Sequence, residues 1–389
     1  MKRWFWGLLP LALVGLLLGT FVRYGPLGVF RASFPPVEEL TIDRAVLPQP
    51  HRIILEVTNG GPGPVTVAQV MVDDAFWQFS IEPAGETIPR LGRSKITIPY
   101  PCVEGETHEV TLLTSTGLTF SHEIAVATTS PSIDFTYLST FTLLGVYAGL
   151  IPVLLGLLFY PFLRELHRGW LNFFLSLTLG LLAFLVIDTL EEALESARKV
   201  ASAYQGVALI GCGVAVALLF LSYLSQRQPA RADKTTPEGR YWTALMIAVG
   251  IGLHNLGEGL AIGSAYAIGE IALGAFLVIG FTLHNLTEGL GIVVPIARDR
   301  PRVRTLILLG SIAGLPTVAG TWIGGFTYNP VWTTFFFALG AGAILQVIYE
   351  VGRLILEQKS GENWASSYNV VGFLVGLAIM YTTGLLVVA

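Results

Sequence analysis

Two six-residue segments of the sequence carry the same unusual set of polar residues. Residues 254–259 read His-Asn-Leu-Gly-Glu-Gly, and residues 284–289 read His-Asn-Leu-Thr-Glu-Gly. In each segment a His and a Glu stand four positions apart, which places both on one face of a helix. The Asn after each His lies about 100° further round the helix, where it can serve a neighbouring edge of the same cavity. Imidazole nitrogen and carboxylate oxygen together suit zinc, and also iron, manganese or cadmium.

Both segments lie inside long apolar stretches. The chain has 389 residues, of which 53% are hydrophobic and 13% charged, whereas ordinary soluble domains carry about 25% charged residues. An ionised side chain in the middle of a bilayer costs at least about 2.5 kcal/mol. One intramembrane His is often a packing residue that is satisfied by a hydrogen bond. A repeated His/Glu face is better explained by a cation that offsets the cost of both sets of polar groups.

The elements that must position these residues are membrane-spanning helices. From residue 137 onward, eight apolar stretches are long enough to cross a bilayer, and helices are the expected spanning form. They cover about 138–163, 171–195, 205–225, 241–266, 270–296, 304–326, 331–356 and 366–388.

The basic residues between these stretches predict their orientation. Those of alternate loops fall on one side, which the positive-inside rule places in the cytoplasm. They are Arg164, Arg168, Arg227, Arg231, Lys234, Arg240, Arg298, Arg300, Arg302, Arg304, Arg353 and Lys359. The opposite side of this part of the chain keeps Arg198 and Lys199. We therefore expect the C-terminus to be extracytoplasmic.

The N-terminal third follows a different pattern. Lys2 and Arg3 precede an apolar run up to Val22, which we interpret as an uncleaved signal-anchor helix within residues 1–33. Residues 34–134 contain short alternating stretches separated by turn residues, which predicts an extracytoplasmic all-β sandwich of immunoglobulin-like type. The predicted strands are Arg52–Val57, Val65–Val72, Phe76–Ile81, Lys95–Tyr100, Glu109–Thr114 and Leu118–Val126. Its histidines, His51, His108 and His122, have no metal-ligand spacing and are expected at the solvated surface.

The repeated H-N-x-x-E-G resembles the signature of the fourth and fifth transmembrane helices of Zrt/Irt-like (ZIP) metal transporters. Similar patterns extend over most of residues 137–389, for example in Phe184–Ala193, Gly314–Gly320 and Phe337–Ala343. The resemblance implies an eight-helix transporter domain over 135–389, movement of divalent metal toward the cytoplasm, and elevator-like displacement of one helix bundle. It also implies a metal centre halfway across the membrane, lined by His254, Asn255, Glu258, His284, Asn285 and Glu288.

The chain departs from the family at the sixth span, where family members often carry a glutamate that serves a second metal position. The corresponding stretch has Pro316-Thr317 and no acid, so a binuclear centre is not supported.

Three acidic residues at the outer end of the second span are weaker metal-site candidates. Asp188, Glu192 and Glu195 share one helical face and could attract cations to an entrance. The alternative is a solvated helix end facing Arg198 and Lys199. In the seventh span, Glu350 could mark an exit or pair with Arg353 three residues later.

The sequence thus predicts a mixed fold, with a signal anchor and a small β-sandwich before a polytopic α-helical bundle. We expect an integral protein of the plasma (inner) membrane that transports Zn²⁺ or another divalent metal as substrate. The expected partners are metal ions and membrane lipid, a homodimer is compatible with the sequence, and the partner of the sandwich is open. A net charge of only −4 gives no indication of a nucleic-acid partner. We also expect no enzymatic activity and no organic cofactor.

Two other functions stay open. An intramembrane metalloenzyme would more typically show H-E-x-x-H, and a metal-sensing receptor would bind metal without ion flux. The two cysteines, Cys102 and Cys212, fall in different predicted domains and support neither a disulfide nor a Cys-based metal site.

Overall fold

The computed structural model describes residues 9–10, 12–20, 37–226, 236–267, 271–357 and 366–388. Within the predicted signal anchor, residues 9–10 and 12–20 are helical, and the other residues of 1–33 lie outside the described ones. The boundaries of the three domains therefore remain predictions. Four of the cations used to orient the chain also lie outside the described residues: Arg227, Arg231, Lys234 and Lys359.

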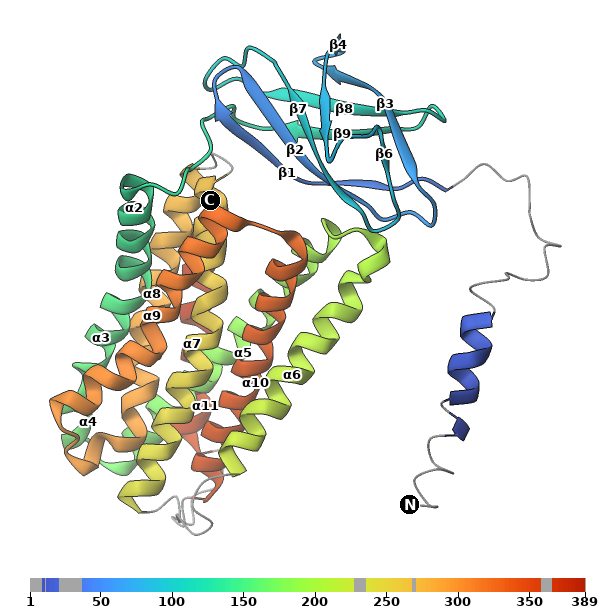
Figure 1. Ribbon diagram of the computed structural model, residues 1–389. Helices are drawn as coiled ribbons and strands as arrows, with labels where there is room; N and C mark the ends of the chain where they lie inside the picture. The colour runs from blue at the N-terminus through green and yellow to red at the C-terminus, as the bar shows by residue number, and fades with distance from the viewer. Residues whose placement is uncertain are drawn as a thin grey trace. The chain divides into compact units, whose positions relative to one another are not determined.

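The segment after the anchor folds into two antiparallel sheets (Figure 1). In spatial order the first contains β1 (Leu40–Gln49), β2 (Arg52–Asn59), β7 (Arg93–Ile98) and β5 (Ser80–Glu82). The second contains β4 (Ala75–Trp77), β3 (Val65–Val72), β8 (His108–Thr114) and β9 (Thr119–Ile124), with β6 (Thr87–Ile88) pairing β3. Buried side chains of both sheets, such as Leu55 and Val70, meet in one core, as alternation along half-buried strands predicts. Whether this sandwich is immunoglobulin-like stays a prediction.

Two strand predictions need correction. The stretch Phe76–Ile81, predicted as one strand, forms β4 and β5, which are edge strands of different sheets. The strand β1 was not predicted, because bulges between Ile42 and Arg44 and between Val46 and Gln49 interrupt its register with β2. Each bulge inserts residues without a partner and breaks the period-two pattern by which a strand is recognised.

His108 is buried rather than solvated. Its side chain is 3% exposed, and its Nδ1 lies 2.7 Å from a carboxylate oxygen of Asp73. The same carboxylate accepts hydrogen bonds from the Tyr100 hydroxyl and the Glu109 amide. Burial acts to raise the pKa of Asp73, but these hydrogen bonds outweigh it and hold the pKa below its ordinary value. The prediction of a surface histidine was therefore wrong for His108, since strand β8 turns it into the sandwich.

The C-terminal part contains eight helical stretches long and apolar enough to span a membrane, counted over the described residues. Most are α-helices with the predicted bounds to within a few residues: α5 (Arg168–Arg198), α6 (Gly206–Gln226), α7 (Pro237–Ala267), α8 (Ile271–Val293), α9 (Val303–Thr327), α10 (Pro330–Glu357) and α11 (Ser367–Val388). They run alongside one another as a bundle (Figure 1). The mixed fold with eight membrane-capable helices is thus confirmed.

The first span is not one regular helix. It consists of α2 (Phe135–Gly145), a π-helical turn η1 (Val146–Leu150), α3 (Ile151–Leu157) and α4 (Tyr160–Glu165). The fifth span likewise continues past α8 into a 3-10 helix, η3 (Val294–Asp299). A 3-10 turn, η2 (Ser202–Tyr204), precedes α6. A π-turn holds one residue more than an α-turn, and such turns are frequent at functional sites.

Glycines let three pairs of helices approach with backbone against backbone. A Cβ on Gly259 of α7 would meet α9, one on Gly289 of α8 would meet α3, and one on Gly180 of α5 would meet α11. In each case the nearest atom is a main-chain carbonyl oxygen, 2.0 to 2.2 Å away. Small residues at such contacts are typical of membrane helices, which associate through close packing. The contact of α7 with α9 and the contact of α8 with α3 fix the direction in which α7 and α8 present their polar faces.

Strand β1 and the residue before it contact the helical part at two points. The Arg44 guanidinium donates to the carbonyl of Phe326 in the last turn of α9, and the carboxylate of Glu39 accepts from the amide and hydroxyl of Ser202, at the start of η2. A cation at a helix C-terminus and an anion at a helix N-terminus both complement the helix dipole.

Candidate metal centre

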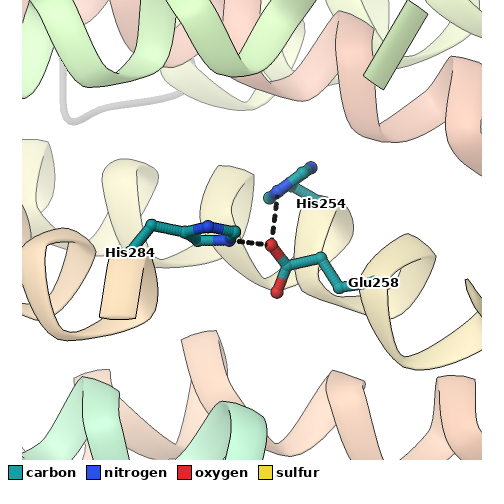
Figure 2. Close-up of side chains that lie close together, drawn as sticks. All are labelled: His254, Glu258 and His284. Carbon is teal, nitrogen blue, oxygen red and sulfur yellow. Dashed lines mark hydrogen bonds and ion pairs between the residues drawn. The ribbon is translucent and has the colours of Figure 1, made fainter. Parts of the chain in front are cut away.

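Helices α7 and α8 bring three of the predicted ligands together. His254 and Glu258 stand one turn apart on α7, and His284 reaches them from α8 (Figure 2). Nε2 of His254 lies 3.0 Å from Oε1 of Glu258, and Nε2 of His284 contacts the same oxygen. The three side chains are 3% to 6% exposed. The i, i+4 spacing and the apolar surroundings account for this geometry directly.

The arrangement has the chemistry of a cation site. One ligand atom from each of the three side chains can be chosen so that all lie within 4.8 Å of one another. Ligand atoms about 2.1 Å from a tetrahedral zinc ion are separated by roughly 3.4 Å, so the spread fits one ion with modest adjustment. Two imidazole nitrogens and one carboxylate oxygen form an N/O set that suits zinc and neighbouring transition metals.

The two asparagines are anchored through their amide nitrogens. Asn255 donates to the carbonyl of Ala313 in α9, at 3.1 Å, and Asn285 donates to the carbonyl of Ala148 in η1, at 3.0 Å. Asn285 also donates to Oε2 of Glu258, at 2.8 Å. Both Oδ1 atoms are buried and have no hydrogen-bond partner among the described residues. Since a buried acceptor without a partner is costly, these oxygens are available to a cation.

Glu288 is placed differently from Glu258. Its side chain is buried, but it does not belong to the cluster of His254, Glu258 and His284. Asn255 is its polar neighbour, yet neither carboxylate oxygen of Glu288 makes a hydrogen bond of good geometry with any residue that the structure describes. Glu288 is thus a buried acid close to the cluster and without a partner of its own. A bound cation would relieve that cost.

Comparison with known proteins matches this part of the chain to a family. Residues 221–384 match the family model described as ZIP Zinc transporter. These residues therefore form a ZIP family domain. The match and the eight membrane-capable helices among the described residues support a membrane transporter of divalent metals. The match covers α7 to α10 with both copies of the motif, and most of α11, whereas the sandwich and the first two spans precede it. No curated protein matches the chain.

The glycine that ends each copy of the ZIP-like motif serves close packing. A glycine at this place in a membrane helix can serve either close packing against a neighbouring helix or local flexibility. A Cβ on Gly259 would lie 2.0 Å from the Thr317 carbonyl oxygen, and one on Gly289 would lie 2.2 Å from that of Val153. Atoms essentially never approach a Cβ so closely, so packing is the reason that both positions are glycine.

The acidic face of α5 lies at the margin of the cluster. Asp188 is exposed and Glu192 is half-buried, and Asp188 is within electrostatic range of His254, His284 and Glu258. Glu195 forms an i, i+4 ion pair with Lys199, at 3.4 Å. The helix-end interpretation therefore applies to Glu195, whereas an entrance role for Asp188 and Glu192 stays a prediction.

Glu350 belongs to a separate polar network that joins α6 and α10. Its carboxylate accepts from the Ser225 hydroxyl, at 2.6 Å, and from the Gln346 amide, at 3.3 Å. Ser222 donates in turn to Gln346, at 2.9 Å. Arg353 stacks over the ring of Tyr349. These contacts place Glu350 in helix packing and outside the cluster around Glu258.

Two residues near the cluster were not predicted. Thr189 of α5 approaches His254 with its hydroxyl, and Gly340 of α10 packs against the backbone of His254. Neither residue type has a spacing that marks it as functional within an apolar span. The one available signal was the position of Thr189 directly beside Asp188, at the point where the apolar run of the second span gives way to acidic residues.

Proposed function

We propose that the chain carries Zn²⁺ across the plasma (inner) membrane toward the cytoplasm. The observation that carries this proposal is the convergence of His254, Glu258 and His284 from two membrane-spanning helices onto one buried point. Zinc is the substrate named first because two imidazoles and a carboxylate match its common ligand set, although iron, manganese and cadmium share these ligands. The description of the matching family names zinc as well.

The six motif residues divide the work of the proposed site. His254, Glu258 and His284 supply the first ligands. The buried Oδ1 atoms of Asn255 and Asn285, which have no hydrogen-bond partner among the described residues, are candidates for further ligands. The carboxylate of Glu288 adds negative charge close by. Asp188 at the exposed margin is the proposed first contact for an incoming cation, since acidic side chains raise the local cation concentration.

The proposed orientation of the chain in the membrane rests on charge, and the proposed direction of transport rests on the ZIP resemblance. Arg164, Arg168, Arg298, Arg300 and Arg302 lie in alternate loops, which favours a cytoplasmic location for that side. The contacts of Glu39 with Ser202 and of Arg44 with Phe326 belong to the other side of the bundle. This arrangement supports an extracytoplasmic sandwich and C-terminus. A homodimer remains a proposal that rests on the sequence alone.

The test is metal flux into proteoliposomes that contain the full chain. We expect uptake of Zn²⁺, compared across Fe²⁺, Mn²⁺ and Cd²⁺, and a loss of at least about tenfold in His254→Ala and Glu258→Gln. Matched controls are His51→Ala and Glu165→Gln, which change exposed residues of the same types far along the chain from the motif. Equal flux in site and control variants would remove the proposal. Metal binding without flux would favour a sensor, and metal-dependent turnover of a membrane substrate would favour an enzyme.

A further inference from the structure

Behind His254, on the side away from Glu258, lies a hydroxyl group from another helix. Oγ1 of Thr189, in α5, is 3.3 Å from Nδ1 of His254. Both residues are 4% exposed, so water does not compete for this contact. The opposite ring nitrogen, Nε2, faces Oε1 of Glu258 at 3.0 Å. The two nitrogens of one imidazole therefore face different partners on different helices.

The direction of the hydrogen bond follows from the other partner of Thr189. A threonine hydroxyl has one proton to donate, and Oγ1 of Thr189 donates it to the Leu185 carbonyl, at 2.7 Å. Toward His254 the same oxygen can therefore act only as an acceptor. Nδ1 of His254 therefore carries a proton. When a cation rather than a proton lies between Nε2 and Glu258, the lone pair of the neutral ring is on Nε2 and faces that cation.

A third helix restricts how the ring can be placed. A Cβ on Gly340 of α10 would lie 3.2 Å from Cα of His254 and 3.7 Å from its Nδ1. Helix α10 thus packs closely on the side of His254 that also contacts Thr189. Helices α5 and α10 pack against each other, so they form one wall behind the imidazole.

We propose that Thr189 is a positioning residue that fixes the tautomer and orientation of His254, so that Nε2 is presented to the metal. This inference rests on the proposed function, in which His254 is a metal ligand. Such partners of metal-binding histidines commonly change metal affinity by about 10- to 100-fold when they are removed. Thr189 lies in the second span, outside the residues that carry the repeated motif.

The first test compares two substitutions in the full chain. Thr189→Val keeps the shape of the side chain but removes the hydroxyl, and Thr189→Ser keeps the hydroxyl. In detergent solution, we expect Thr189→Val to weaken Zn²⁺ binding by about 10- to 100-fold in competition with a chromophoric chelator, and Thr189→Ser to retain most of the affinity. Equal affinity in Thr189→Val and the wild type overturns the proposal, and so does equal weakening in Val and Ser. If Thr189→Val does not fold, Thr189→Ala takes its place in the comparison.

A second measurement reports the tautomer itself. In ¹⁵N-histidine solid-state NMR of the Zn²⁺-loaded protein, we expect His254 to show a protonated Nδ1 and a metal-bound Nε2. Thr189→Val should no longer show this one combination of a protonated Nδ1 and a metal-bound Nε2, and Thr189→Ser should keep it. His254→Ala distinguishes a failure of the proposed metal site from a failure of the role proposed for Thr189. If it leaves Zn²⁺ binding unchanged, the proposed site fails, whereas weak binding in His254→Ala with normal binding in Thr189→Val overturns the role of Thr189 alone.

Discussion

Replacing Gly259 by alanine tests how tightly α7, the helix that carries His254 and Glu258, is packed on α9. The added Cβ would lie 2.0 Å from the Thr317 carbonyl oxygen and 2.9 Å from the Thr321 amide nitrogen. Ordinary van der Waals contact begins at 3.4 Å, so the two backbones must separate by about 1.4 Å, the difference between 3.4 and 2.0. Main-chain atoms of a helix cannot turn aside as a flexible side chain can.

The expected cost combines two terms. Overpacking of a close contact costs about 1–3 kcal/mol, and the separation also strains the hydrogen bond from Asn255 to the Ala313 carbonyl, one turn away, which is worth about 1 kcal/mol. Alanine regains about 1 kcal/mol through its higher helix propensity. We expect Gly259→Ala to destabilise the protein by about 2 kcal/mol net.

The matched control is Gly211→Ala in α6, where nothing lies within 4 Å of the added Cβ. It should be neutral or gain up to about 1 kcal/mol. Both variants are measured by reversible unfolding in mixed detergent micelles, and Zn²⁺ affinity is measured on the folded fraction. We expect weaker Zn²⁺ binding in Gly259→Ala as well, since Glu258 precedes the displaced residue. Equal stability of the two variants would refute the close approach of α7 and α9.

Three further predictions concern separate parts of the chain. Zn²⁺ at 100 times its Kd should stabilise the protein by about 2.7 kcal/mol, seen as a higher melting temperature that a chelator reverses and that Glu258→Gln abolishes. Asp73 has a pKa held below its ordinary value, so its contribution to stability is complete above about pH 4 and is lost as the pH falls through the folded pKa. The hydrogen-exchange protection of the Glu109 amide, which donates to Asp73, should therefore fall in acid, and Asp73→Asn should remove this dependence on pH. The same pH profile in Asp73→Asn and the wild type would contradict the assignment. Ser225→Ala should destabilise the protein by about 1.5–3 kcal/mol, because it removes a hydrogen bond to the buried carboxylate of Glu350. If Ser225→Ala costs as much in a Glu350→Gln background as in the wild type, the bond to the carboxylate contributes nothing.

The sequence was most informative where one physical constraint dominates. Apolar length alone predicts the eight spans, because lipid excludes any spanning backbone that is not internally hydrogen-bonded. The i, i+4 spacing predicts that His254 and Glu258 share a face, and the repeat predicts that His284 meets them. These predictions require only that α7 and α8 are neighbours, and they do not depend on how the other helices are arranged.

The sequence was least informative where a contact depends on helices far apart in the chain. Thr189 approaches His254 because α5 and α7 both pack against α10, and no spacing within either segment contains that information. The burial of His108 likewise depends on its pairing with Asp73, 35 residues earlier. In both cases the residue is ordinary for its element, and only the tertiary partner gives it a role.

The Asn and Gly of the two motif copies pack against neighbouring segments that differ in helical geometry. Asn255 and Gly259 face the carbonyls of Ala313 and Thr317, four residues apart in α9, as a regular α-helix provides. Asn285 and Gly289 have the same spacing, but the carbonyls that they face, those of Ala148 and Val153, are five residues apart. The π-helical turn Val146–Leu150 holds the additional residue. The irregular turn in the first span thus lets α8 dock in the same way as α7, and this places His284 opposite Glu258.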